Sequence, residues 1–508
     1  MNYTNKKALV LGLGESGLAA ARWLVRCGAV LRVADTREVP ERLAQLNAFA
    51  PDAEFVSGHV GGKFAAALLE GIDFVIVSPG LSELNELAEI IPIANERTIP
   101  VWSEIELFAQ CLQHLHETQK YQPKVIAVTG TNGKTTVTSL VGLLVERAGK
   151  NVRIAGNISP AVLDVLRTAL DEDALPEIWV LELSSFQLHR TYSLNADAAT
   201  VLNLTPDHLD WHGTMDAYAA DKANIFSEHT IQVLNRDDSA VMQMKKPSAD
   251  IVTFGQSTPT LPNEFGLKNE NGMTWLCIAN AVEDEVAPTK RKQKNRTRLE
   301  VEVEVEIEVQ VAHLMPADAL KIRGTHNAVN ALAALALCRA INLPMAPLLH
   351  GLREYQGEPH RVELIATIKE VAYYDDSKGT NVYATVAAIN GLAKPGAAIW
   401  LIAGGLGKGQ DFAPLRDAVK QSVSAVFLIG QASDEIALAL DGSGTELIRC
   451  ISLELAVSAA AAKAQAGDIV LLSPACASFD MFKSYTQRGQ VFADAVKEIG
   501  LGCGDLVI

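Results

Sequence analysis

The stretch VIAVTGTNGKTTVTSL combines a glycine-rich turn with a lysine and two threonines. The apolar residues before the turn predict a buried strand, and those after it predict a helix. Gly130 and Gly133 allow backbone N–H groups to approach phosphate oxygens, and Lys134 adds positive charge. Thr135 adds a hydroxyl that can bind Mg²⁺. The spacing is GxxGKT rather than that of the usual P-loop, because Val128 occupies the position of the first glycine. The stretch therefore predicts a nucleotide-phosphate site.

A second glycine turn, LGLGESG, lies near the N-terminus between a predicted strand and a predicted helix. Gly12, Gly14 and Gly17 have the GxGxxG spacing, which lets backbone N–H groups approach a diphosphate at a helix N-terminus. Asp35 ends the next predicted strand, as in dinucleotide-binding units. The motif specifies diphosphate geometry more than nicotinamide, so both a dinucleotide and a UDP-sugar remain open.

Further polar residues follow two other predicted strands. Glu182 ends the strand in IWVLELSS, and His208 lies between Asp207 and Asp210 after AATVLNLT. Since parallel strands in a doubly wound sheet end at the same edge, we expect Glu182 and His208 near the phosphate loop. Lys222, on the following helical stretch, reads by itself as an exposed lysine. Nucleotide binding at this point leaves a GTPase switch, a kinase and a ligase open.

Three α/β units must position these residues. The chain has 508 residues, enough for about three domains of ~150 residues. Short apolar runs such as KALVLGLG and AVLRVAD alternate with helical patterns, which predicts parallel strands covered by helices. Similar units start at KVIAVTG and after GEPHRVEL. We expect a Rossmann-like domain over residues 1–100, a P-loop domain with a parallel-rich sheet over 101–358, and a Rossmann-like domain over 359–508.

Two segments interrupt this pattern. Residues 114–124, HLHETQKYQPK, are polar and lack a periodic apolar face, so we expect a connection between domains. Residues 281–311 contain the basic run KRKQKNRTR, followed by alternating Val and Glu. The alternation predicts a strand with one apolar face, in a solvated hairpin extension. A docking surface for an acidic partner is the alternative for this insertion.

The composition argues against several classes of protein. The net charge of −16 disfavours nucleic-acid binding but leaves a small anionic substrate open. No apolar run approaches the ~20 residues of a membrane span, and the N-terminus shows no signal-peptide segment. We therefore expect a cytoplasmic protein without membrane insertion. The scattered cysteines include no CxxC pair, which disfavours a zinc ribbon.

Taken together, these residues resemble the Mur ligase family of peptidoglycan synthesis. The resemblance covers nearly the whole chain and rests on GTNGKTT, LELSSFQL, NLTPDHLDWHG, YAADKANIF, RGTHNAVNALAA, GEPHRVEL and YYDDSKGTN. LGLGESG with ADTRE, GGLGKGQDF and LLSPACASFDMFKSYTQRG are similar to the members that add D-glutamate to UDP-N-acetylmuramoyl-L-alanine. The Asn-Pro-Arg motif typical of the diaminopimelate-adding and lysine-adding members is absent. Folylpolyglutamate synthases share the ATP loop but generally lack the N-terminal domain.

The resemblance implies an ATP-dependent ligase. The γ-phosphate of ATP would pass to the alanyl carboxylate of UDP-N-acetylmuramoyl-L-alanine, and the amine of D-glutamate would attack the acyl phosphate. A tetrahedral intermediate would then collapse to amide, phosphate and ADP. Phosphorylation makes chemical sense because a free carboxylate is a poor electrophile. The implied cofactors are ATP and two Mg²⁺ ions, and the implied state is a monomer.

Matched motif positions imply four groups of site residues. The catalytic group is Lys134, Glu182, His208 and Lys222. The metal ligands are Thr135, Glu182, His208 and Lys222 as a carbamate. The nucleotide-binding group is Gly130, Thr131, Asn132, Gly133, Lys134, Thr135, Thr136, Asn327, Arg361 and Asp376. The group around the UDP-substrate is Ser16, Asp35, Thr36, Arg37 and Asn157. The D-glutamate group is Thr380, Lys408, Ser478, Phe479 and Tyr485.

Several alternatives stay open. An NAD-dependent dehydrogenase would explain GxGxxG but not the second glycine turn, PHR or DDSKGTN. A nucleotide-controlled binding switch would need the phosphate loop but no amino-acid pocket. Another Mur-type ligase would differ in its acceptor, and a folylpolyglutamate-type ligase would generally also lack the N-terminal domain. For the ligase, we expect the third domain to close over ATP.

Overall fold

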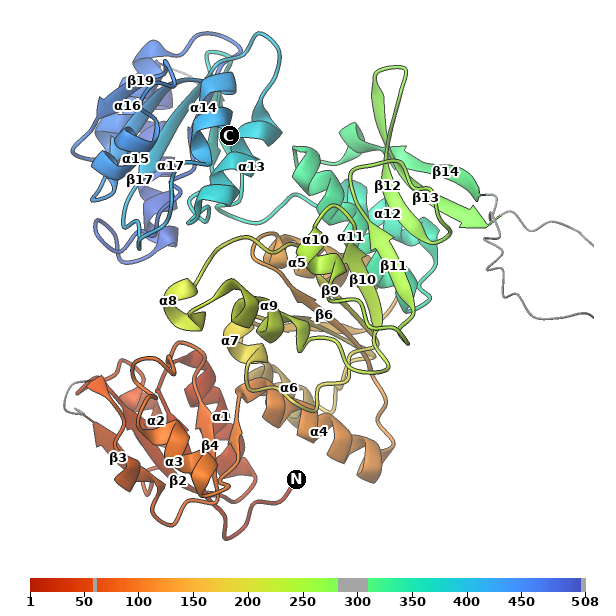
Figure 1. The fold of residues 1–508 in the computed structure, drawn as a ribbon, viewed down its shortest axis with the longest axis vertical. Helices are drawn as coiled ribbons and strands as arrows, with labels where there is room; N and C mark the ends of the chain where they lie inside the picture. The colour runs from red at the N-terminus through yellow and green to blue at the C-terminus, as the bar shows by residue number, and fades with distance from the viewer. Residues whose placement is uncertain (58–61, 282–308, 504–508) are drawn as a thin grey trace, which may run out of the picture.

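The computed structural model describes residues 1–57, 62–281 and 309–503, which form three α/β domains in a row along the long axis of the molecule (Figure 1). Their sheets have five, nine and six strands. The predicted fold class of three α/β domains is confirmed. Within the described ranges, we find no helix that is both long and apolar enough to span a bilayer.

The first domain is a parallel sheet in the order β3-β2-β1-β4-β5. Its elements are β1 (Lys7–Leu11), α1 (Glu15–Arg26), β2 (Val30–Asp35), α2 (Leu43–Phe49), β3 (Glu54–Ser57), the 3₁₀ helix η2 (Ala66–Leu69), β4 (Phe74–Val77), α3 (Ile90–Glu96) and β5 (Val101–Trp102). The strand order reverses at β1, so the crevice beyond the ends of β1 and β4 is where such a sheet holds a ligand. Since β5 pairs with β4, the sheet ends two residues beyond the boundary expected at residue 100.

Helix α4 (Glu104–Gln119) links the first two domains. Ser103 caps its N-terminus by accepting the N–H of Glu106, and Lys120 ends it with a φ of 59°. The expected connection over residues 114–124 thus consists of the end of α4, residues 114–119, and the short segment that leads into the central domain. The sequence shows little apolar periodicity there because Leu115 alone of this last stretch is buried.

The central domain has the strand order β14-β13-β12-β11-β10-β9-β6-β8-β7, parallel from β7 to β12 and antiparallel beyond. Its strands are β6 (Lys124–Thr129), β7 (Val152–Gly156), β8 (Ile178–Glu182), β9 (Ala198–Val201), β10 (Ile231–Asn235), β11 (Ile251–Phe254), β12 (Glu264–Glu270), β13 (Met273–Ala281) and β14 (Val309–Pro316). The insertion expected over 281–311 falls outside the described residues except for its two ends, which belong to β13 and β14.

Helices cover both faces of the central sheet. They are α5 (Lys134–Arg147), α6 (Val162–Asp171), α7 (Ser185–Leu188), α8 (Leu209–His212), α9 (Met215–Ala223), α10 (Ser239–Met242), the 3₁₀ helix η3 (Ala317–Ala319), α11 (Thr325–Ala340) and α12 (Met345–Glu354). Buried residues of α5 and α11 pack together against the sheet. The short helix α8 lies on the side of the central domain that faces both outer domains (Figure 1). The helices α7, α8 and α9 follow the strands that carry the predicted site residues.

The third domain has the strand order β15-β16-β20-β17-β18-β19, with only β15 antiparallel to its neighbour. Its elements are β15 (Glu363–Ile368), β16 (Val371–Asp375), α13 (Val382–Leu392), β17 (Ile399–Gly404), α14 (Leu415–Ser422), β18 (Val423–Ile429), α15 (Ser433–Ala439), β19 (Glu446–Arg449), α16 (Leu453–Lys463), β20 (Ile469–Leu472) and α17 (Tyr485–Cys503). The strands β17, β18 and β20 are buried along almost their whole length, as their continuous apolar sequences predict.

Candidate functional site

The predicted phosphate loop joins the buried strand β6 to helix α5. Gly130 has a φ of 150° and Gly133 a φ of 85°, both in the region that favours glycine. A Cβ atom at Gly133 would lie 2.8 Å from Asn330 Oδ1, and one at Gly130 would lie 3.0 Å from Leu202 Cβ. The loop therefore needs glycine for its backbone conformation and for its close packing against the neighbouring strand and helix.

Two lysines converge on the same carbonyl of this loop. Lys134 Nζ donates to the carbonyls of Gly130 at 2.8 Å and Thr131 at 2.9 Å, and Lys222 Nζ donates to Gly130 at 3.0 Å. Lys222 is 1% exposed, so its reading as an exposed lysine is wrong. Burial lowers the pKa of both lysines, and for Lys222 the charge of Lys134 adds to that effect. Two lysine amines thus lie next to each other at one carbonyl of the phosphate loop.

Glu182 ends β8 beside the loop and is buried. Its Oε1 accepts the Nδ2 hydrogen of Asn157 at 2.9 Å, and its carbonyl accepts the Asn157 N–H at 2.7 Å. A Cβ at Gly156 would lie 2.2 Å from the same carbonyl, so a glycine is required at the end of β7, directly before Asn157. Glu182 Oε2 is buried without a hydrogen-bond partner among the described residues. A buried carboxylate oxygen in this state is suited to a cation.

His208 precedes α8 and has a φ of 54°. Its ring meets Phe186 edge to face at 4.8 Å, and its side chain is 42% exposed. The pKa of His208 is lowered, chiefly by burial, and the positive charges of Lys134 and Lys408 act in the same direction. His208 thus lies within electrostatic reach of a lysine of the phosphate loop and a lysine of the third domain.

The third domain meets the loop across a cavity of about 330 Å³. Arg361 Nη2 donates to Thr135 Oγ1 at 2.6 Å, and Asn381 Nδ2 donates to Asn132 Oδ1 at 3.0 Å. The cavity lining includes six residues of the predicted nucleotide-binding group: Asn132, Gly133, Thr136, Asn327, Arg361 and Asp376. The structure therefore brings together residues that are far apart in the sequence.

Two residues of this lining are fixed by their own hydrogen bonds. Asn327 is buried and donates to the carbonyl of Arg323 at 2.8 Å. Asp376 Oδ2 accepts the hydroxyl hydrogen of Ser473 at 2.6 Å, and burial raises the pKa of Asp376 to about 7. The Asp376 carboxyl is thus a group that can change protonation near neutral pH.

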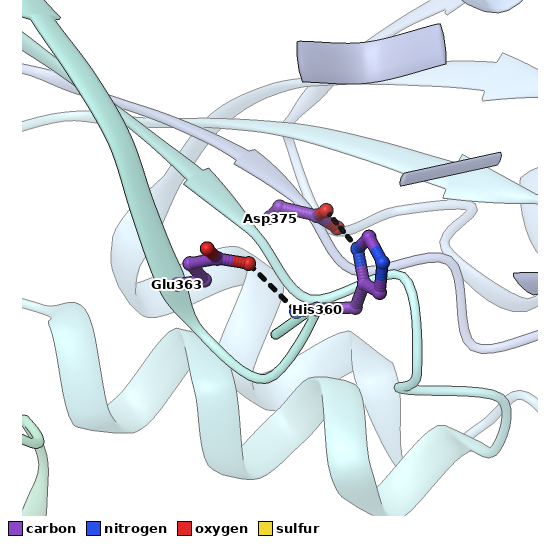
Figure 2. Close-up of side chains that lie close together, drawn as sticks. All are labelled: His360, Glu363 and Asp375. Atoms are coloured by element: carbon purple, nitrogen blue, oxygen red, sulfur yellow. Dashed lines mark hydrogen bonds and ion pairs between the residues drawn. The ribbon is translucent and has the colours of Figure 1, made fainter. Parts of the chain in front are cut away.

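A histidine and two carboxylates lie together at the linker between α12 and β15, residues 355–362, which carries Arg361 (Figure 2). His360 Nδ1 lies 2.6 Å from Asp375 Oδ2, and the His360 N–H donates to Glu363 Oε2 at 2.8 Å. One side-chain nitrogen or oxygen atom from each of these three residues lies within 4.8 Å of the others, close enough to bind a metal ion together. Both carboxylates already bind hydrogens of His360, and a Cβ at Gly489 would lie 2.2 Å from His360 Nδ1. The cluster therefore acts as a tightly packed support for the Arg361 backbone.

The residues predicted to surround the UDP-substrate lie on both sides of the junction between the first and central domains. Asp35 is buried and accepts the Leu13 N–H of the first glycine turn at 2.7 Å and Arg37 Nε at 2.8 Å. Burial acts to raise the pKa of Asp35, but hydrogen bonds from Arg37 and Leu13 outweigh it and lower the pKa. Ser16 is the second residue of α1, Thr36 follows Asp35, and Asn157 belongs to the central domain.

The residues predicted to bind D-glutamate make two different sets of contacts. Lys408 Nζ lies 6.0 Å from the ring centroid of Phe479, next to the buried Ser478. Tyr485 instead lies under Lys378 Nζ, which is 3.8 Å from its ring centroid, and faces the linker. Thr380 lies beside the linker as well, where its N–H donates to the carbonyl of Lys378 at 2.8 Å.

Sequence reasoning missed several residues of the site. Lys378 and Asn381 stand inside the motif YYDDSKGTN, yet the motif alone does not show which side chains face the loop. Lys378 lines the cavity, and Asn381 reaches Asn132. Asp221, next to Lys222, accepts hydrogen bonds from two histidines. Only the adjacency of Asp221 to a predicted site residue could have indicated it.

Three family descriptions match the chain in order. They are "Mur ligase MurD-like, N-terminal domain" over residues 6–101, "Mur ligase middle domain" over 128–338 and "Mur ligase, glutamate ligase domain" over 360–476. The chain is 56% identical over 498 residues to "UDP-N-acetylmuramoylalanine--D-glutamate ligase" of Ralstonia nicotianae, with 98% of this chain and 97% of the relative covered. It is 57% identical over 506 residues to the protein of the same name from Paraburkholderia xenovorans, with 98% and 97% covered.

Solved structures share the fold at low sequence identity. The crystal structure of MurF ligase from Thermotoga maritima in complex with ADP has a TM-score of 0.58 and 16% identity, covering 92% of this chain and 96% of that one. That of UDP-N-acetylmuramate-alanine ligase MurC from the same organism has a TM-score of 0.54 and 18% identity, covering 97% and 99%.

Proposed function

Because the chain belongs to the Mur ligase family, we propose that it joins D-glutamate to UDP-N-acetylmuramoyl-L-alanine while ATP is converted to ADP and phosphate. The observation that carries the chemistry is the cavity between the phosphate loop and the third domain, which Arg361 lines while it donates a hydrogen bond to Thr135 of the loop. The names of the relatives support the choice of D-glutamate as acceptor. The reaction would contribute to peptidoglycan synthesis.

The residues of this chain would divide the work as follows. The loop from Gly130 to Thr136 would bind the ATP phosphates through its backbone N–H groups, with Lys134 at the outer phosphates. Arg361 would bind them from the opposite wall. The transferred phosphoryl group would bond to the alanyl carboxylate oxygen and leave ADP, and the D-glutamate amine would then displace phosphate. Asn157 would orient the alanyl end, because its amide is fixed by Glu182.

Mg²⁺ fits the polar groups beside the loop. Glu182 Oε2 is buried and has no hydrogen-bond partner within the described part of the chain, and Thr135 and His208 offer further oxygen and nitrogen ligands. Bound Mg²⁺ would neutralise negative charge between ATP and the carboxylate. We propose two ions held by Thr135, Glu182, His208 and modified Lys222.

Lys222 is proposed to react with CO₂. Its amine nitrogen would bond to carbon and release a proton, which leaves a carbamate with oxygen ligands. Only the neutral amine has a free electron pair, and burial with the nearby Lys134 charge lowers the pKa of Lys222 well below its ordinary value. We expect Lys222→Ala to be inactive and partly rescued by a short carboxylate such as formate in the buffer. Full activity of Lys222→Ala without formate would exclude the carbamate, and Lys150→Ala is the control.

The test of the function is an amino-acid panel with ATP and UDP-N-acetylmuramoyl-L-alanine. We expect phosphate release and amide formation with D-glutamate and neither with L-glutamate, L-lysine or meso-diaminopimelate. Oxygen-18 in the alanyl carboxylate should appear in the released phosphate, because the acyl phosphate keeps one carboxylate oxygen on phosphorus. Release that ignores the amino acid, or phosphate without oxygen-18, would exclude the acyl-phosphate ligase. Sedimentation equilibrium tests the expected monomer.

A further inference from the structure

The loop over residues 78–86, which follows β4, touches both the first glycine turn and the central domain. Ser78 Oγ donates to the carbonyl of Gly12 at 2.7 Å, and a Cβ at Gly12 would lie 3.2 Å from Leu81 Cδ1. On the other side, Trp211 Nε1 of α8 donates to the Leu81 carbonyl at 3.0 Å. A movement of the central domain relative to this loop would therefore disturb the glycine turn.

Glu83 adds an ionic contact at the same junction. Its Oε1 accepts hydrogen bonds from His189 Nε2 at 2.8 Å and from Arg190 Nη2. Arg190 is buried, and its carbonyl accepts the N–H of Ser103 at 3.0 Å. Glu83 is itself 41% exposed, so a single pair here would contribute little. Two anchored cations on one carboxylate form a network, which holds its geometry better than an isolated pair.

The network continues from His189 into the site. His189 Nδ1 lies 2.8 Å from Asp221 Oδ1, and His212 Nδ1 lies 2.9 Å from Asp221 Oδ2. His212 Nε2 lies 2.9 Å from Ser185 Oγ. The hydrogen bonds to Asp221 and then to Glu83 raise the pKa of His189 to about 9, so it carries a proton at neutral pH. The Asp221 carboxylate thus ties α9 to α8, to the start of α7 and to the first domain.

Each of these helices also carries or follows a proposed site residue. Ser185 lies shortly after Glu182, His212 lies one turn after His208, and Asp221 immediately precedes Lys222. The described chain therefore has a continuous set of hydrogen bonds from the sugar-nucleotide side of the molecule to the helices around the phosphate loop.

We propose that Glu83 is a positioning residue that fixes the first domain on the central domain for a substrate that spans both. We name the contact of Leu81, Glu83, His189, Arg190 and Trp211 the interdomain clamp. The proposal rests on the proposed function, in which the alanyl end of the UDP-substrate lies at Asn157 of the central domain, and on the expectation that its diphosphate lies at the first glycine turn. A fixed junction presents both halves of that site together, so binding need not immobilise the domains.

The test compares Glu83→Ala, Glu83→Gln and wild type. We expect the KM for UDP-N-acetylmuramoyl-L-alanine to rise about tenfold in Glu83→Ala, because two charge-assisted hydrogen bonds between the domains are lost. Glu83→Gln should lie between, at about threefold, since its amide oxygen still accepts a hydrogen bond without the charge. The KM values for ATP and D-glutamate should stay within about twofold of wild type, because their residues lie at the other junction.

This pattern separates positioning from a folding defect. A partly unfolded enzyme would lose kcat and leave every KM unchanged, so a KM effect on one substrate is specific. Asp171→Asn is the matched control, because it removes the Arg26–Asp171 ion pair at the same junction but outside the interdomain clamp. An unchanged KM in Glu83→Ala, an equal rise for all three substrates, or an equal effect of Asp171→Asn would overturn the proposal.

A second measurement is independent of the ligase reaction. Hydrogen exchange of wild type and Glu83→Ala without substrates should show faster exchange over residues 78–86 and unchanged exchange in β6 and α5. Equal exchange over 78–86 would overturn the interdomain clamp. Failure of wild type to ligate D-glutamate would overturn the proposed function instead, so the two failures are distinguishable.

Discussion

The first and second domains share a hydrophobic core, whereas the second and third domains meet through polar side chains around a cavity. Leu18 and Leu24 of α1 belong to one buried cluster with Phe108 of α4 and Trp179 of β8. The buried apolar residues of the third domain form two clusters that, within the described ranges, include no residue of the other domains. Its contacts to the phosphate loop are hydrogen bonds such as Arg361–Thr135.

This difference has a physical consequence. Separating the first junction, between the first and second domains, would expose apolar surface, which costs about 25 cal/mol per Å². At the second junction, between the second and third domains, water can replace the hydrogen bonds at little net cost. The second junction is therefore the one that can open for ATP, which agrees with the expectation that the third domain closes over the nucleotide. That closure stays a prediction, and solution scattering with and without ATP and substrates would test it.

The largest expected effect is on turnover, at the polar junction. Lys134→Ala should lower product formation by about a thousandfold or more, because it would remove the positive charge that we propose beside the outer phosphates. The protein should stay folded, since burial already opposes the charge of Lys134 and lowers its pKa. Phosphate release and circular dichroism test both parts. The exposed Lys150→Ala in the same domain is the control, and an unchanged rate in Lys134→Ala would remove this lysine from the mechanism.

The shared core predicts a different result for stability. Phe108 is fully buried and meets Trp179 edge to face at 5.1 Å. Phe108→Ala should cost about 3–5 kcal/mol and lower the unfolding transition of the first two domains together. Phe427→Ala, in the separate core of β18, should lower that of the third domain alone. Urea unfolding followed by hydrogen exchange in each domain is the measurement. Equal effects of Phe427→Ala on all three domains would contradict the comparison.

Sequence patterns predicted the central strands well, because strands such as KVIAVT and IWLIAG are buried on both faces and read as continuous apolar runs. Glycine spacing located the phosphate loop for a similar reason, since backbone conformation demands that residue type. Contacts across domains were harder to predict. Glu83 and His189 are ordinary polar residues in their local sequence, and they meet only because the junction brings them together.

Lys222 shows that local sequence also fails to predict which charged side chains are buried. A lysine in an alanine-rich helical stretch reads as exposed, yet its Nζ is buried against the carbonyl of Gly130. Burial of a charged group depends on which segment covers it, and sequence periodicity contains no information about that. The family resemblance, rather than the local pattern, was what singled out Lys222.

The polar junction should also respond to a charge-conserving change. Arg361→Lys keeps the positive charge but removes the planar fork that donates to Thr135. We expect kcat/KM for ATP to fall about tenfold to a hundredfold, with the KM for the UDP-substrate unchanged. Steady-state kinetics with each substrate varied in turn is the measurement. The Glu83 variants should show the reverse pattern, and a common pattern in both sets would mean that the two junctions are not independent.

The smallest expected effect is the pH dependence of the first junction. The folded-state pKa of His189 is raised to about 9, by Asp221 first and then Glu83, from an unfolded value of about 6.5. The folded state therefore binds more protons between these values, and the stabilisation is fully present below about pH 6.5 and lost as the pH rises through 9.

Stability of His189→Gln should be lower than that of wild type at pH 6, with the difference shrinking towards pH 9. Urea unfolding at several pH values tests this, with the exposed His229→Gln as control. A difference between wild type and His189→Gln that stays constant from pH 6 to pH 9 would mean that the imidazolium does not stabilise the junction.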